Sequence, residues 1–112
     1  MQAAREAWAD AGLGTPETRD RSAAVIVGSG AGGVDVAERQ YRAFFADAWN
    51  RVSPYAIPVS IVGMVSSEIS IALGLRGDSH VLSTGCTSST DAIGYAAALI
   101  RHGDADAIAG GG

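Results

Sequence analysis

The chain has 112 residues, one cysteine and a formal net charge of −4. This length supports one modest hydrophobic core, and an acidic chain without a basic patch is not expected to bind nucleic acid. A single cysteine excludes an internal disulfide and a cysteine-based metal cluster, and the lack of any long apolar run predicts a soluble, cytoplasmic protein without a membrane partner.

The first quarter of the chain is expected to supply one helix and one buried strand. Residues 2–11 place apolar side chains on one side of a helix, and Gly12 is suited to end it. Residues 13–21 are polar and contain a proline, so we expect a loop there. Residues 23–27 are all apolar and of strand length, which is typical of a buried parallel strand.

The glycine-rich turn that follows this strand allows two interpretations. Gly28, Gly30 and Gly33 match the G-x-G-x-x-G pattern of dinucleotide-binding turns. That pattern also requires a second strand that ends in an acidic residue about 20 residues later, and residues 50–54 are not such a strand end. We therefore prefer a glycine turn that lets two elements approach closely, followed by a helix over residues 35–49 with a broad apolar face.

The middle of the chain is expected to form a loop and then a long helix. Residues 51–58 contain Pro54 and Pro58, which restrict the backbone and disfavour helix directly before each proline. Residues 59–73 show helical spacing of apolar side chains, and Gly74 is suited to end that helix.

The lone cysteine, Cys86, falls where a strand predicted over residues 81–84 leads into a helix predicted over residues 92–100. The Ser and Thr residues around it can cap the helix through their side-chain oxygens. The positive end of the helix dipole favours the thiolate, which is the nucleophilic form of cysteine, and nearby backbone N–H groups can stabilise an oxyanion. A small buried cysteine with a structural role is the alternative, and the residues alone leave both interpretations open.

The helix after Cys86 is apolar on nearly every side, so we expect it to be buried all round. Gly94 in its interior costs about 1 kcal/mol relative to alanine, which suggests that another backbone packs against it. The helix is expected to end at Gly103, and residues 105–109 are expected to form a last strand. Strands that alternate with helices predict an α/β fold with a parallel or mostly parallel sheet.

Several segments resemble one known family, in the same order along the chain. They are residues 27–33, 53–58, 73–77, 83–96 and 103–111. Segment 83–96 reads Ser-Thr-Gly-Cys-Thr-Ser-Ser-Thr-Asp-Ala-Ile-Gly-Tyr-Ala and is similar to the nucleophile motif of the β-ketoacyl synthases. These condensing enzymes of fatty-acid and polyketide synthesis are built on the thiolase fold.

The resemblance implies a fold and a reaction. Residues 1–112 would be a partial N-terminal domain of the thiolase-like α/β fold, with a mostly parallel sheet and a buried nucleophile helix, but without the first strand and the C-terminal half. Cys86 would accept an acyl group from an acyl carrier protein, and malonyl-acyl carrier protein would then lose CO2 and attack the thioester. The family also implies a homodimer, or a heterodimer with a ketosynthase-like subunit. We expect neither a cofactor nor a metal.

Two alanines stand where this family lines its acyl pocket. By the resemblance, Ala31 in the glycine turn and Ala56 in the proline loop bind the substrate, and the Ala56 loop reaches the pocket of the partner subunit. Both side chains are small, so we expect a wider or longer pocket than in members with bulkier residues. The histidines that assist decarboxylation belong to the second half of the family's fold, and neither His80 nor His102 is expected to replace them.

Three interpretations follow from the sequence. The chain is part of a condensing enzyme, or part of a non-catalytic partner subunit like the chain-length factor of aromatic polyketide systems, or an unrelated nucleotide-binding domain. Partner subunits usually lack the nucleophile, so Cys86 argues for the catalytic kind. The 112 residues alone are not expected to complete a condensation, and they are expected to expose apolar surface.

Overall fold

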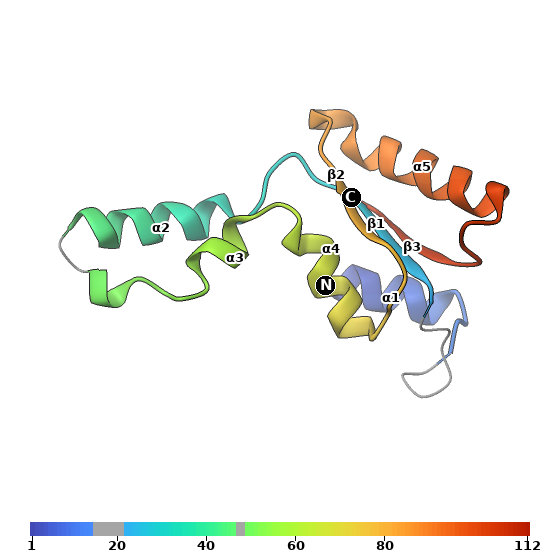
Figure 1. The fold of residues 1–112 in the computed structure, drawn as a ribbon, viewed down its shortest axis with the longest axis horizontal. Coiled ribbons are helices and arrows are strands. Elements are labelled where there is room, and N and C mark those ends of the chain that lie inside the picture. Colours follow the sequence, from blue (N-terminus) through green and yellow to red (C-terminus); the bar gives the residue numbers. More distant parts are fainter. Residues whose placement is uncertain (15–21, 47–48) are drawn as a thin grey trace.

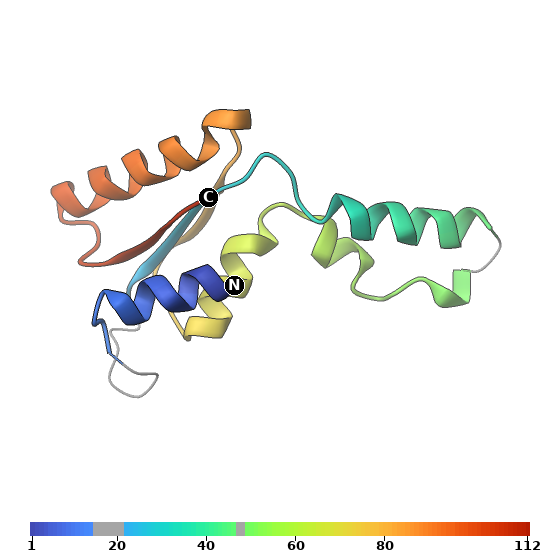
Figure 2. The ribbon, with the colours of Figure 1, turned by 180° about the vertical axis from the view of Figure 1, so that it is seen from behind.

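A parallel sheet of three strands lies between helices, and a long helical arm projects from it in the computed structural model (Figures 1 and 2). The structure describes residues 1–14, 22–46 and 49–112. The strands are β1 (Ala24–Gly28), β2 (Ser79–Leu82) and β3 (Ile108–Gly111), in the spatial order β2-β1-β3. Both neighbours run parallel to β1, so the predicted α/β fold with a parallel sheet is confirmed.

The central strand β1 is buried on both of its faces. Alternate side chains of a strand point to opposite faces of the sheet, so Val25 and Val27 lie in one apolar cluster and Ile26 in another. Because all five β1 residues are apolar or glycine, neither face leaves an unpaired polar side chain inside the protein. The prediction of a buried parallel strand at residues 23–27 is thus confirmed.

Helices α1 (Gln2–Asp10) and α4 (Met64–Leu73) cover the face of Val25 and Val27, and helix α5 (Ser88–His102) covers the face of Ile26. On the first face the indole of Trp8 packs with Ile69 and Leu73. Helices α1, α4 and α5 end at or within one residue of the positions predicted for them. Within the described ranges, no helix is both long enough and apolar enough to cross a membrane.

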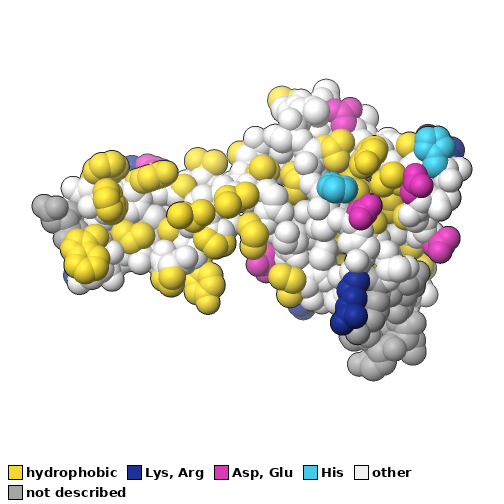
Figure 3. Space-filling view, viewed as in Figure 1, with side chains coloured by type: hydrophobic (Ala, Val, Ile, Leu, Met, Phe, Trp, Pro, Cys, Tyr) yellow, Lys and Arg dark blue, Asp and Glu magenta, His cyan; other side chains and the backbone are white. Residues whose placement is uncertain are grey.

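The arm consists of α2 (Val34–Phe45), a 3-10 turn at Trp49–Arg51, and α3 (Ala56–Ser60). It gives the chain a radius of gyration of 16.2 Å and a longest extent of 52 Å, whereas a compact domain of similar length has a radius of about 13 Å. Phe44 and Phe45 contact each other edge to face but remain 56% and 79% exposed. Figure 3 shows hydrophobic side chains gathered along the visible face of the arm.

The helix predicted over residues 35–49 is found as α2, one residue earlier at its start and ending at Phe45. Residues 47–48 lie outside the described part of the chain, as do residues 15–21 of the predicted polar loop.

Two predictions for the middle of the chain are wrong. Ala56 and Ile57 are helical although Pro58 follows them. Pro58 lies in the first turn of α3, where a backbone N–H has no helical acceptor and its loss costs little. The helix predicted over residues 59–73 is interrupted, because Ile61 has an extended backbone (φ −77°, ψ 125°) and α4 begins only at Met64.

The outer strands are displaced from their predicted positions. β2 begins at Ser79 instead of residue 81, and β3 begins at Ile108 instead of residue 105. Their bounds follow the hydrogen-bonded register with β1, in which Val25 pairs with Ser79 on one side and Ala109 on the other. The local pattern of side chains carries no information about that register.

The prediction that α5 is buried on every side is wrong for the residues described. The buried positions of the helix are Ser88, Ala92 and Ala96, which face the sheet. The large side chains of Ile93 and Tyr95 are 56% and 42% exposed, because no described element covers the outer face of α5. A Cβ on Gly94 would meet no atom within 4 Å, so the backbone contact expected there is also absent from the described part of the chain.

We expect Gly28→Ala and Gly94→Ala to change the stability of the chain in opposite directions. A Cβ on Gly28 would lie 2.2 Å from the carbonyl carbon of Ser88, so one of the two elements must move. This overpacking should lower the free energy of unfolding by about 1–3 kcal/mol. At Gly94, alanine meets open space and should raise that free energy by up to about 1 kcal/mol.

Urea denaturation of the 112-residue chain, followed by circular dichroism, would measure both changes. Equal stabilities of the two variants would contradict the close contact between β1 and α5.

Candidate active site

Cys86 lies on a 3-10 turn, η2 (Gly85–Thr87), that joins the end of β2 to the start of α5. Gly85 has a positive φ of 71°, which costs little only for a residue without a Cβ. This backbone turns the chain from the strand into the helix and leaves the thiol exposed. The predicted place of Cys86 at a strand-to-helix junction is confirmed, and Cys86 is not buried among the residues that the structure describes.

The hydroxyl residues do not cap α5 in the predicted way. Thr87 is the N-cap residue, and its side chain makes no capping hydrogen bond. The hydroxyl of Ser88 points back into the turn instead, where it accepts from the Thr84 N–H at 2.9 Å and donates to the Gly85 carbonyl at 2.6 Å. Ser88 is buried, so these two bonds satisfy a polar group that would otherwise be costly to bury.

Three further side chains that the sequence analysis did not single out form a network beside Cys86. The Thr84 hydroxyl donates to the Asp91 carboxylate, and the Thr87 hydroxyl lies 3.0 Å from the Thr84 carbonyl oxygen and 3.2 Å from Asp91 Oδ2. Together with Ser88, these residues have the spacing i, i+3, i+4 and i+7, which places them on one side of a helical turn. That spacing is a signal in the sequence that could have identified them.

The glycine turn after β1 borders the Cys86 turn. A Cβ on Gly30 would lie 3.8 Å from the Gly85 carbonyl oxygen, and Ser29 Oγ donates to the Ala31 carbonyl at 2.7 Å. Ala31 is therefore carried on a loop that lies against the Cys86 turn, at the same end of the sheet.

The close-approach interpretation of the glycine turn is confirmed. The space that a side chain would need at Gly28 is occupied by the backbone of Ser88, and at Gly33 a Cβ would lie 2.5 Å from the carbonyl oxygen of Val59. After this turn α2 leaves the sheet and pairs with α3 in the arm (Figure 1). The arrangement differs from a dinucleotide site, in which the helix after the glycines packs back onto the sheet.

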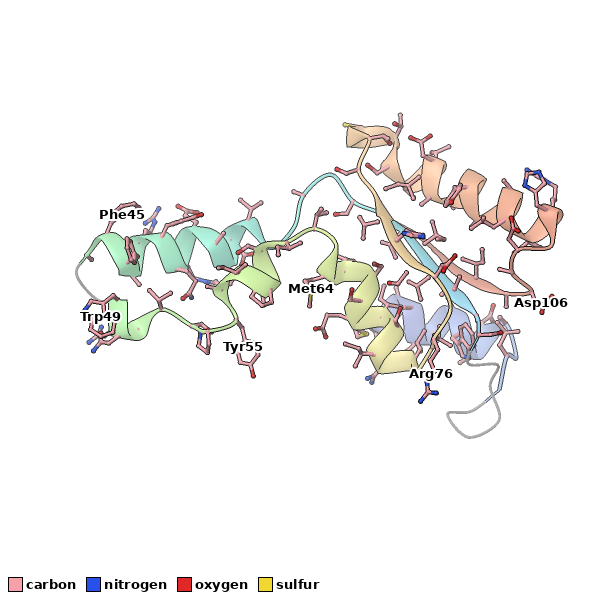
Figure 4. All side chains as sticks on the ribbon, in the orientation of Figure 1. Phe45, Trp49, Tyr55, Met64, Arg76 and Asp106 are labelled. Atoms are coloured by element: carbon pink, nitrogen blue, oxygen red, sulfur yellow. The ribbon has the colours of Figure 1, made fainter. Side chains whose placement is uncertain are left out.

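Ala56 lies away from Cys86 within this chain. It is the first residue of α3 and lines a cavity of about 420 Å³ between α2, Val52 and α3. The cavity is lined almost wholly by apolar side chains and includes Tyr41, Phe44, Phe45, Val52, Ile57 and Ile61. Figure 4 shows Phe45, Trp49 and Tyr55 spread along the arm, away from the sheet.

The two histidines are not placed beside Cys86. His80 is exposed on β2, and His102 is the last residue of α5, at the opposite end of that helix from the Cys86 turn.

Comparison with known proteins assigns the chain to one family. Residues 1–112 match the family model described as "Beta-ketoacyl synthase, N-terminal domain". Among curated relatives, a 3-oxoacyl-[acyl-carrier-protein] synthase 2 of Coxiella burnetii is 40% identical over 112 residues, which are 100% of this chain and 27% of the relative. The synthase 2 of Vibrio cholerae is 39% identical over 107 residues, covering 96% of this chain and 26% of the relative. That of Staphylococcus aureus is 37% identical over 110 residues, covering 98% and 27%.

The chain thus spans about a quarter of the length of these relatives, over the segment that contains Cys86. The parallel sheet and the family match together confirm the predicted partial thiolase-like α/β fold class. The third interpretation, an unrelated nucleotide-binding domain, is wrong, because the match covers every residue of the chain. The chain belongs to the β-ketoacyl synthase family.

Proposed function

We propose that this chain carries the nucleophile of a β-ketoacyl-acyl carrier protein synthase and that Cys86 is that nucleophile. The observation that carries the proposal is the exposed thiol on a turn at the start of α5, a helix of 15 residues. The dipole of such a helix favours negative charge at its N-terminal end, and the thiolate is the form of cysteine that attacks.

The proposed reaction has two steps linked by a covalent intermediate. In the first, Cys86 Sγ attacks the thioester carbonyl of an acyl-acyl carrier protein, and the carrier thiolate leaves as the acyl-cysteine forms. In the second, malonyl-acyl carrier protein loses CO2, and the resulting carbanion attacks the acyl-cysteine carbonyl. A carbon–carbon bond forms, the Cys86 thiolate leaves, and the product stays on the carrier as a 3-oxoacyl thioester.

Backbone N–H groups beside Cys86 are suited to stabilise the oxyanion of both steps. The first N–H groups of a helix have no acceptor within it, and a pre-positioned donor of this kind stabilises a tetrahedral intermediate. We assign the Cys86 N–H to one side of the oxyanion hole. The other donors and the histidines that assist decarboxylation are expected from the second half of the family's fold, so residues 1–112 are not expected to complete the reaction alone.

We also propose that the arm belongs to an interface between two ketosynthase-like subunits, in a homodimer or a heterodimer. Ala56 lies in the arm and apart from Cys86, so it can line an acyl pocket only if another subunit brings its own nucleophile near. The exposed aromatic side chains of the arm support a partner surface, since a monomer rarely exposes so large an apolar area.

The non-catalytic partner subunit is not favoured. Such subunits usually lack the nucleophile, whereas this chain has Cys86 exposed, and the curated relatives above are all named as synthases.

Fatty-acid and polyketide synthesis both remain within the proposal, and the cytoplasmic location stays a prediction from the sequence.

Incubation of the complete gene product with an acyl-acyl carrier protein should add one acyl group to Cys86. The Cys86→Ala variant should add none and should lose condensation by a factor of about 10³ or more, as expected when a covalent nucleophile is removed. Mass spectrometry of the intact protein and of its peptides would measure the adduct and its position. An acyl adduct elsewhere, with none on Cys86, would contradict the assignment.

Ala31→Phe should shift the acyl-chain preference toward shorter chains. Ala31 lies on the loop that borders the Cys86 turn, and a phenyl ring there would occupy space that we assign to the acyl chain. In an apolar pocket, one methylene group more or less in the substrate changes the preference by about 10–200-fold.

Acyl transfer from a series of carrier thioesters of increasing chain length would measure the preference. Ile71→Phe, on the exposed side of α4, is a matched control. An unchanged preference in Ala31→Phe would refute the proposed pocket.

A further inference from the structure

The residue before Gly85 is held through all three of its polar groups. The Thr84 N–H donates to Ser88 Oγ at 2.9 Å, its carbonyl lies 3.0 Å from the Thr87 hydroxyl, and its own hydroxyl donates to the Asp91 carboxylate. We call these four residues the Thr84 network. Its two ends, Thr84 and Asp91, lie on either side of Cys86 in the sequence, so the network closes a loop of chain around the thiol.

The described residues leave most of this loop uncovered, although the glycine turn borders it at Gly85. Residues 83–87 are all exposed, and a Cβ on Gly85 would meet no atom within 4 Å. A segment with few packed neighbours has many accessible conformations unless hydrogen bonds restrict it. The Thr84 network supplies those bonds, and Asp91 supplies the only charged group among its four members.

The position of Asp91 is well suited to this role. It lies in the first turn of α5, where the helix dipole stabilises a carboxylate. An ionised carboxylate accepts stronger hydrogen bonds than a neutral group, and Asp91 Oδ2 is within reach of both the Thr84 and the Thr87 hydroxyl. A single rigid helix therefore connects to both sides of the Cys86 turn.

We propose that Asp91 is a positioning residue for Cys86, acting through the hydroxyl of Thr84. The inference rests on the proposed function, because positioning matters for a nucleophile that must meet a thioester carbonyl at about 3–3.5 Å. A misplacement of about 1 Å can slow such a reaction about 10²-fold. Asp91 itself touches neither the substrate nor the reacting atoms in this scheme.

Single-turnover acylation of Cys86 in the complete gene product tests the proposal. Thr84→Val removes the hydroxyl but keeps the shape, and Asp91→Ala removes its acceptor. Each should slow acyl transfer at saturating acyl-acyl carrier protein by about tenfold or more, with little change in the half-saturating concentration. Thr84→Ser restores the hydroxyl and should stay within about twofold of the unmodified protein, as should the control Asp106→Ala, an exposed acid far from the turn (Figure 4).

The double variant Thr84→Val/Asp91→Ala separates a shared interaction from two independent effects. If both residues act through one hydrogen bond, the rate of the double variant should lie within about twofold of the rate of the slower single variant. A purely structural role would lower the melting temperature and the folded fraction and leave the rate per folded protein unchanged. That result would overturn the proposal, as would equal rates for Thr84→Val and Thr84→Ser.

A second readout keeps this inference distinct from the proposed function. If the unmodified protein takes no acyl group, the proposed function fails, and alkylation of Cys86 by iodoacetamide then tests the Thr84 network alone. Alkylation in Thr84→Val and Asp91→Ala should be slower by about threefold, because the thiol leaves its place at the helix end, while Thr84→Ser matches the unmodified protein. Equal alkylation rates in all four proteins would overturn the proposal.

Discussion

The backbone of β1 touches the backbone of α5 at Gly28, and the place of Cys86 depends on this contact. Gly28 leaves no room for a side chain beside Ser88 and Ser89, and one turn further along, Ile26 packs on Ala92 and Ala96. The helix is thereby fixed with its first turn at the carboxyl ends of β1 and β2. In parallel sheets this edge is where ligands bind. The Cys86 turn and the glycine turn meet there because each directly follows its strand.

The chain combines a packed sheet with surfaces that its described elements leave open. The β1 side chains are buried on both faces, whereas the outer face of α5 and the aromatic residues of the arm are largely exposed. Apolar area of this extent is unusual on a soluble monomer. It is consistent with the proposals that a second subunit meets the arm and that the rest of a condensing enzyme supplies the remaining catalytic groups.

Hydrogen bonds hold the turn that carries Cys86, and the described side chains leave most of this turn exposed. Thr84, Thr87, Ser88 and Asp91 connect the turn to the first turn of α5, while the thiol remains exposed. Among the described residues, no packed group covers this side chain. Hydrogen bonds thus hold the turn while its thiol stays exposed, which is compatible with a nucleophile that must accept a substrate delivered by another protein.

The amino-acid sequence was enough to predict the α/β class, a buried strand at residues 23–27, which is found at Ala24–Gly28, the helix ends near Gly74 and Gly103, and Cys86 at a strand-to-helix junction. These features follow from local apolar spacing and from glycine, which act over a few residues. The three-dimensional fold was needed to establish the bounds of β2 and β3, the helix at Ala56, and which face of α5 is buried. It also decided that the Ser and Thr hydroxyls bind within the Cys86 turn and do not cap α5. These features depend on the register with β1 and on neighbours up to 84 residues away, as between Ala24 and Ile108, and no local pattern contains that information.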